Sequence, residues 1–272
     1  MLVDTHCHLN IMVKEAFDEP LQPDQLNNAQ SIIAQAHHHN VTGIINVGTS
    51  LVESKNCIML AQKFTGVWAA VGIHPNDCTD DWQSDITELK KLVKNKEKNK
   101  IVAIGETGLD RHYPDYNIIR QKDAFRAQID LALTHDLALI VHTRKAKDET
   151  LSVLEEFKGD LKRGIIHCFS EDLDFARHAF TLGFVLGIGG TVTYPNNATV
   201  RSVVETVPLS NIVLETDAPF LPPQTIRGKQ NSPAQIATIA HYIAELKKIS
   251  YQEVADQTTH TACTLFDITL EK

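Results

Sequence analysis

A regular alternation of short apolar runs and amphipathic segments along the whole chain constrains the fold most strongly. Apolar runs bounded by turn residues predict eight strands, at 1–5, 41–47, 67–72, 101–105, 137–142, 163–167, 183–187 and 211–216. The segments between them carry apolar residues at three- and four-residue spacing. This spacing predicts helices, for example at 26–39, 86–96, 117–135 and 173–183. Such alternation is typical of a parallel sheet that is covered by helices.

Eight strand–helix units favour a TIM-type (β/α)8 barrel over an open, doubly wound sheet, which remains the structural alternative. Two further helical segments, 233–249 and 250–266, follow the eighth strand. We find no linker, low-complexity segment or shift in composition. We therefore expect residues 1–272 to form a single α/β domain with extra C-terminal helices.

Composition and charge narrow the class of protein. The longest apolar runs are strand-sized, and the N-terminus lacks the pattern of a secretion signal, so we expect no membrane association. Five cysteines without CxxC spacing favour a reducing compartment, and we expect a cytoplasmic protein. A net charge of -8 argues against broad electrostatic adhesion to nucleic acid. It does not exclude a phosphate-bearing substrate, because bound divalent ions reverse the local field. The oligomeric state stays open, and a monomer is compatible with the sequence.

Two histidines follow the first predicted strand in the motif DTHCH. Residues two apart in an extended segment point to the same side, so His6 and His8 direct both imidazoles toward one point while Cys7 faces away. This spacing suits chelation of a metal ion. An isolated HxH pair is weak evidence, since it arises often by chance.

Four more potential ligands end later strands: Glu106, His142, His167 and Asp217. Each alone has a structural alternative, namely a core histidine, a helix cap or a turn residue. The carboxyl ends of barrel strands form the active-site face, however, and all six residues fall there. Imidazole with carboxylate suits Zn, Mn, Fe or Mg. We expect Cys7 and Cys168 to point into the barrel wall, and the glycine of TGLD, which follows Glu106, to permit a tight turn.

Cationic side chains near the predicted strand ends form a second group. These are Arg111, Arg144, Lys145, Arg227 and Lys229, and His74 follows the third strand. At the barrel mouth they are suited to binding phosphate oxygens. The alternative for each is a solvated loop charge.

The chain resembles the TatD family of metal-dependent deoxyribonucleases over nearly its whole length. The resemblance rests on seven motifs in family order: DTHCHLN at 4–10, GIHP at 72–75, GETGLD at 105–110, HTRKA at 142–146, HCFS at 167–170, ETDAPFLPP at 215–223 and RGKQNSP at 227–233. Two positions depart from the usual family pattern. Thr107 stands where isoleucine is common, and Arg111-His112 stand where an aromatic residue commonly begins.

The resemblance implies a site for two divalent ions, Mg, Mn or Zn. His6, His8 and Asp217 would surround one ion, His142 and His167 the other, with Glu106 shared. Similar barrels often use a carboxylated lysine as the bridge, whereas strand four here ends in Glu106. The resemblance also makes His74 and Arg227 contacts of a substrate phosphate. It gives Asp217 and Glu106 catalytic roles.

The predicted function is hydrolysis of DNA phosphodiester bonds by a metal-activated water, and the resemblance implies an exonuclease. Asp217 would accept or relay the proton of that water. One alternative is hydrolysis of a carboxylic ester or amide, including an aminoacyl-tRNA bond, because the same activated water attacks a carbonyl. A different class is a binding protein that keeps its metals for structure alone; closed four-coordinate sites would favour it.

Overall fold

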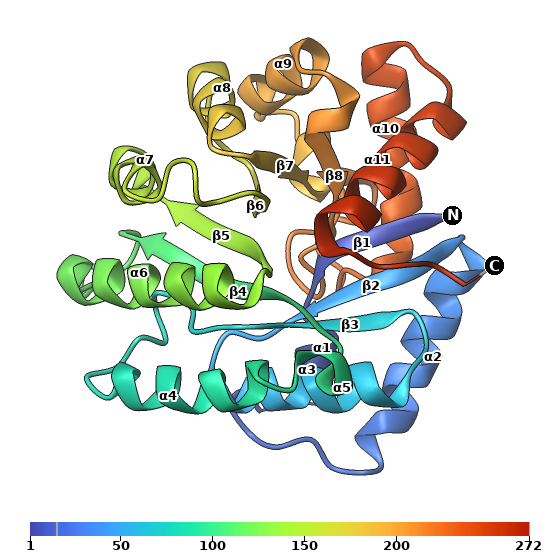
Figure 1. Ribbon diagram of the computed structural model, residues 1–272. Coiled ribbons are helices and arrows are strands. Elements are labelled where there is room, and N and C mark those ends of the chain that lie inside the picture. Colours follow the sequence, from blue (N-terminus) through green and yellow to red (C-terminus); the bar gives the residue numbers. More distant parts are fainter. Residues whose placement is uncertain (15, 272) are drawn as a thin grey trace.

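The computed structural model describes residues 1–14 and 16–271. Eight parallel strands pair in chain order from β1 to β8, as in a barrel (Figure 1). The strands are β1 (Leu2–Cys7), β2 (Val41–Val47), β3 (Val67–Val71), β4 (Ile101–Asp110), β5 (Ala138–Arg144), β6 (Gly164–Ile166), β7 (Phe184–Ile188) and β8 (Ile212–Leu214). The predicted (β/α)8 fold is confirmed, and the doubly wound alternative is wrong.

Helices separate the strands and cover the outside of the barrel (Figure 1). They are α1 (Leu9–Met12), α2 (Gln25–His38), α3 (Leu51–Lys63), α4 (Trp82–Val93), α5 (Lys96–Asn99), α6 (Ile118–His135), α7 (Lys147–Glu155), α8 (Leu173–Thr181), α9 (Ala198–Thr206), α10 (Ile236–Lys247) and α11 (Tyr251–Phe266). Both predicted C-terminal helices are present as α10 and α11. Within the described residues, no helix has the length and apolar character that crossing a bilayer requires.

Side chains that alternate along the strands build two apolar layers. The inward layer includes Val3, Ile45 and Ile140, and it packs with Leu265 and Phe266 at the end of α11. The outward layer packs the strands against the surrounding helices. Burying a side chain such as Phe266 contributes about 1.5–3 kcal/mol. Helix α11 therefore closes one end of the barrel, and the polar strand ends are left at the other.

The barrel closes between β1 and the segment after β8. Asp217 N–H donates to His6 O at 2.9 Å and His8 N–H donates to Ala218 O at 2.8 Å. The buried carboxyl group of Asp4 accepts the backbone N–H of Thr216 at 2.9 Å and also its hydroxyl. These bonds join residues that lie more than 200 positions apart, and they bring the first and last predicted metal ligands together.

Strands β4 and β5 are longer than predicted. The sequence placed their ends at 105 and 142, but they run to Asp110 and Arg144. The predicted tight turn at Gly108 is wrong, because the chain stays paired with β5 there. A Cβ at Gly108 would lie 2.0 Å from His142 O, and its φ of +141° disfavours other residues. This glycine allows two backbones to approach closely.

Candidate metal centre

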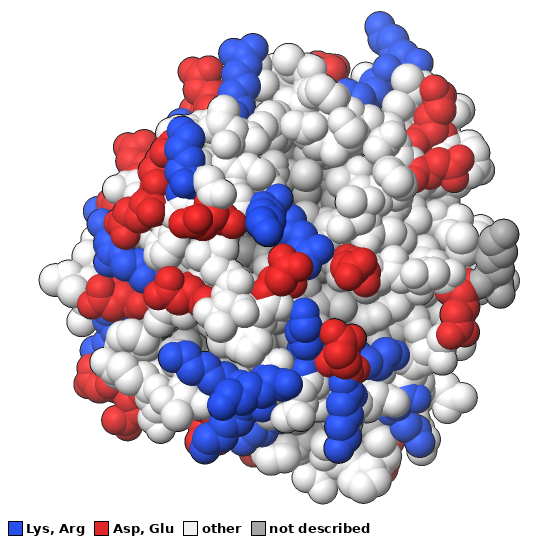
Figure 2. All heavy atoms as spheres, in the orientation of Figure 1, with Lys and Arg blue, Asp and Glu red and all other residues white. Residues whose placement is uncertain are grey.

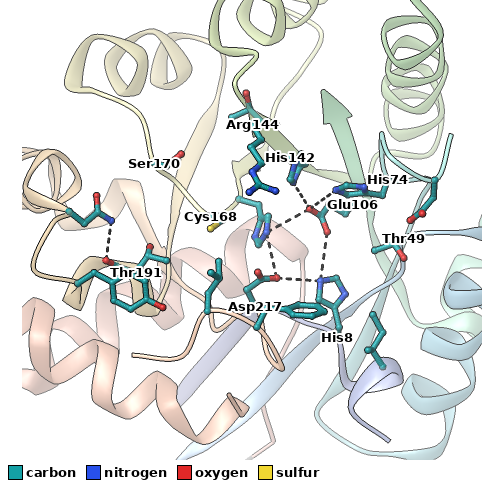
Figure 3. A pocket seen from close by; sticks show the side chains of 18 of the residues that line it. His8, Thr49, His74, Glu106, His142, Arg144, Cys168, Ser170, Thr191 and Asp217 are labelled. Carbon is teal, nitrogen blue, oxygen red and sulfur yellow. Dashed lines mark hydrogen bonds and ion pairs between the residues drawn. The ribbon is translucent and has the colours of Figure 1, made fainter. Parts of the chain in front are cut away.

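The six predicted ligands meet at one end of the barrel, with Glu106 at their centre. Figure 3 shows His8, Glu106, His142 and Asp217 of this group. The two oxygens of Glu106 face different histidines. Oε2 lies 3.3 Å from His6 Nε2 and 3.7 Å from His8 Nε2. Oε1 lies 2.8 Å from His142 Nδ1 and 3.7 Å from His167 Nε2. A carboxylate in this position has one oxygen available to each of two groups of imidazoles.

Asp217 closes the opposite side of the cluster. Its Oδ1 lies 3.3 Å from His8 Nε2 and 3.7 Å from His167 Nε2. The position follows from the barrel closure, which ties the backbone of Asp217 to that of His6. His6 lies in β1 and His8 directly follows the last residue of this strand, and their Nε2 atoms lie 3.2 Å from each other. The end of β1 and the residue after it therefore direct both rings toward Asp217 and Glu106.

The outward nitrogens of three histidines have partners that leave the inward nitrogens free for a cation. His8 Nδ1 lies 2.8 Å from the carbonyl oxygen of Val47, to which it donates its proton. His167 Nδ1 lies 3.0 Å from Glu215 Oε1, and His142 Nε2 lies 3.2 Å from Asp110 Oδ2. Partners of this kind fix the ring orientation and tautomer of metal-binding histidines. Converging imidazole and carboxylate donors of this kind fit divalent metal ions.

The electrostatics of the cluster favour positive charge. Burial lowers the pKa of His167, but Glu215 and Glu106 outweigh burial and raise this pKa to about 10. Burial is likewise outweighed at His8 by Asp217, and at His142 by Asp110 and Glu106, so both pKa values rise. The surrounding histidines hold the pKa of Glu106 well below its usual range despite burial. Ionised carboxylates at the centre attract protons or metal ions.

A cavity of about 750 Å³ opens onto this cluster. Its floor includes His8, Glu106, His142, His167 and Asp217, and its wall includes apolar and aromatic side chains: Ile11, Phe17, Tyr194, Phe220 and Leu221. The metal centre is thus accessible to a ligand of nucleotide size or larger.

Comparison with known sequences identifies the family. A sequence model described as TatD related DNase matches residues 3–267. The chain belongs to the TatD family. YabD of Bacillus subtilis, an uncharacterized metal-dependent hydrolase, is 35% identical over 268 residues, which cover 98% of this chain and 100% of YabD. YcfH of Escherichia coli, described in the same words, is 33% identical over 98% of this chain and 96% of YcfH.

A solved structure supports the same placement. The crystal structure of YjjV, a TatD homolog from Escherichia coli K12, is 29% identical and superposes with a TM-score of 0.88 over 98% of each chain. This TatD-family protein is therefore a metal-dependent hydrolase. The roles of its individual residues stay predictions, although all six predicted ligands lie in one cluster.

Two buried carboxylates beside the metal centre were not predicted from the sequence. Asp110 and Glu215 contact the outward nitrogens of His142 and His167. Both lie in motifs that were recognised, GETGLD and ETDAP. The adjacent Gly187 makes room for Glu215, because a Cβ there would lie 2.1 Å from its Oε2. The only sequence signal for these two residues was an acidic residue close to a predicted ligand. This signal does not distinguish a buried partner of a histidine from an acid on the surface.

Cys168 corrects another expectation. It was expected to point into the barrel wall, as the fully buried Cys7 does. Instead Cys168 lines the cavity, and Figure 3 shows its sulfur near Asp217. Its φ of +46° turns the side chain away from the direction that a continuing strand would give it. Burial raises the pKa of this thiol well above its usual value, so it stays protonated.

The two predicted substrate contacts differ in position. His74 lines the cavity, and its Nε2 lies 3.7 Å from Glu106 Oε1. Arg227 is not among the cavity-lining residues. Its guanidinium stacks on the ring of Tyr194, 4.6 Å from the ring centre, and Tyr194 itself lines the cavity. Arg227 therefore supports the wall, and its direct contact with a substrate phosphate stays a prediction.

Proposed function

We propose that this TatD-family hydrolase is a deoxyribonuclease that cleaves DNA phosphodiester bonds, working from the end of a strand. It would use two divalent ions, Mg, Mn or Zn. The proposal rests on one observation above all: each oxygen of Glu106 faces a different set of imidazoles. In the cytoplasm, where we place the enzyme, its five free cysteines stay reduced.

The donor set divides into two groups that share Glu106. His6, His8 and Asp217 would hold one ion, and His142 and His167 the other. Bound divalent ions lower the pKa of water and polarise phosphoryl oxygens. Asp217 would accept the proton of the attacking water. Histidine contacts lower the pKa of this carboxyl despite its burial, so it is ionised near neutral pH.

His74 is suited to donate a hydrogen bond to a phosphoryl oxygen. The backbone N–H of Asn76 donates to its Nδ1 at 3.1 Å, so its proton resides on Nε2, which faces Glu106. Burial and the neighbouring His142 lower the pKa of His74 to about 3. The ring is neutral at working pH and presents one N–H to the substrate.

The test is cleavage of labelled single- and double-stranded DNA by the pure protein, with added Mg or Mn and with EDTA. We expect release of nucleotides that EDTA abolishes. His142→Ala and Asp217→Ala should each lower the rate at least a hundredfold, as losses of direct participants do. Unchanged activity in EDTA or in both variants would contradict the proposal.

Hydrolysis of a carboxylic ester or amide, including an aminoacyl-tRNA bond, is the competing outcome of the same experiment. A parallel reaction with aminoacyl-tRNA separates the two activities by product. If free amino acid is released and DNA yields no nucleotides, the substrate is a carboxylic ester and not DNA. The proposed activation of water by the metal ions would be the same for both substrates.

A further inference from the structure

We propose that Arg144 is the side chain that binds the non-bridging oxygens of the substrate phosphoryl group. This inference rests on the proposed function and names the cation that serves it. It replaces Arg227, to which sequence resemblance assigned that role.

The extension of β5 carries Arg144 into the cavity. His142 and Arg144 lie two residues apart in this strand, so their side chains point to the same side. Thr143 points the other way, and its hydroxyl lies 3.0 Å from that of Thr150. Arg144 lines the cavity, and Figure 3 shows its guanidinium directed toward the group of Glu106 and His142. Arg144 therefore lies on the same side of β5 as the predicted metal ligand His142, two residues closer to the carboxyl end of the strand.

Two of the competing cations near the mouth are already engaged. The guanidinium of Arg111 pairs with Glu149 and donates to Tyr116 Oη at 3.3 Å. Arg227 stacks on Tyr194 and points its donors toward Gln224. Among the described residues that line the cavity, Arg144 is the one Lys or Arg. Its side chain is exposed and forms no ion pair with a described carboxylate. Its fork of donors is therefore available to a ligand.

Most other cations lie on the outer helices. The segment from 90 to 100 alone holds six lysines, and Figure 2 shows blue side chains gathered where Figure 1 places α4. Lys90, Lys91 and Lys94 on and after this helix are exposed. Charges on the outside of the barrel cannot touch a group that is held at the metal centre. Among the described residues that line the cavity, Arg144 therefore supplies the permanently charged cation.

Guanidinium geometry suits this task. Two parallel N–H donors match two oxygens of a phosphoryl group, and such charge-assisted pairs are stronger than neutral hydrogen bonds. A lysine ammonium supplies charge but no fork. Losing the contact should weaken phosphate binding about ten- to hundredfold, the range expected for a hydrogen bond to a charged group.

Calorimetric titration of inorganic phosphate into the Mn-loaded protein tests the proposal. We expect Arg144→Ala to weaken phosphate binding at least tenfold and Arg144→Lys to recover part of the loss. Arg177→Ala is the matched control, because Arg177 is exposed on α8 and does not line the cavity; it should bind phosphate as the unmodified protein does. Arg227→Ala is measured alongside. Manganese content, measured on the same samples, should be equal in all variants.

Unchanged phosphate affinity in Arg144→Ala, or a loss found in Arg227→Ala alone, would overturn the proposal. So would a loss in Arg144→Ala that accompanies loss of manganese, because Arg144 would then support the metal centre. The DNA assay is read separately. If Arg144→Ala loses phosphate binding but the unmodified protein cleaves no DNA, Arg144 keeps its assignment and the proposed nuclease activity fails.

Discussion

Asp110 is a buried carboxylate that we expect to position His142. Its Oδ2 contacts His142 Nε2 at 3.2 Å and accepts Asn76 Nδ2 at 2.9 Å. Gln121 holds the backbone of Asp110 from both sides, at 3.0 and 2.9 Å. Asp110→Asn keeps the shape but removes the charge that orients the ring. We expect it to weaken manganese binding about 10- to 100-fold in calorimetry, the usual effect of losing such a partner.

Asp115→Asn is the matched control for Asp110→Asn, since Asp115 is an exposed acid a few residues further along the chain. Its manganese affinity should equal that of the unmodified protein. If Asp110→Asn also binds manganese normally, His142 does not need this partner, and the positioning role is wrong.

At the level of single residues, the sequence was informative where spacing or strand position carried the signal. His6 and His8 were predicted because alternate residues of a strand share a side. Asp110 was missed because β4 continues past Glu106 through a register shift between Ile104 and Thr107. Which side a residue faces after such a shift depends on the neighbouring strand, and no local pattern records it.

The connection between α1 and α2 brings an aromatic side chain to the cavity, and Glu53 of α3 anchors it. Phe17 lines the cavity. Glu53 is buried and accepts Lys14 Nζ at 2.6 Å, Asp18 N at 2.7 Å and Asn10 Nδ2 at 2.8 Å. Glu53→Gln leaves the buried Lys14 ammonium without its counter-ion. We expect it to lower the free energy of unfolding by about 3 kcal/mol near neutral pH, measured in urea.

This effect should depend on pH in a defined direction. Burial raises the pKa of Glu53, but Lys14 and the two asparagine amides outweigh it, so the folded-state pKa lies below the usual 4.5. The stabilisation is complete above pH 4.5 and disappears as the pH falls through the folded-state pKa. The stability difference between the unmodified protein and Glu53→Gln should therefore shrink in acid.

Glu88→Gln is the control, because Glu88 forms an exposed pair with Lys91 on α4. It should leave unfolding unchanged at every pH tested. A difference between the unmodified protein and Glu53→Gln that stays constant from pH 7 to pH 3 would argue against an ionised Glu53 as the anchor.

Helices and most strands were predictable as elements, within a few residues of their ends. The exception is β4, which runs to Asp110, five residues past its predicted end at 105. Gly105 and Gly108 in β4 look like turn residues, but both allow close contact with β5, at Ile140 and His142. Glycine has the same identity in a turn and in a tight strand pair, so composition alone does not separate the two.

For the whole molecule, Asp4 is the side chain that links the first strand to the last. It accepts two donors of Thr216 and the N–H of His6. Asp4→Ala leaves these donors buried without partners. We expect a loss of about 3 kcal/mol or more in unfolding free energy, and weaker manganese binding because His6 and Asp217 are no longer held together.

Asp24→Ala serves as the control for the closure, since Asp24 is exposed and its side chain makes no cap hydrogen bond with α2. It should change neither stability nor manganese affinity. Full stability in Asp4→Ala would mean that the backbone bonds between His6 and Asp217 and between His8 and Ala218 close the barrel without help.

The barrel as a whole was predictable because the strand–helix unit occurs eight times. A wrong boundary in one unit does not change the fold that the eight units predict together. The closure was not, because the Asp4–Thr216 contact joins residues 212 positions apart and leaves no local pattern. The same holds for the wall of the cavity, which Arg144 lines directly while Arg227 stacks on the wall residue Tyr194. Contacts between residues this far apart in the sequence become visible only when the strands are placed in the barrel.

Anomalous diffraction from crystals of the manganese-loaded protein tests the central claim most directly. We predict two manganese peaks that share Glu106, one in contact with His6, His8 and Asp217 and the other with His142 and His167. A single peak, or peaks that do not touch Glu106, would contradict the two-ion centre.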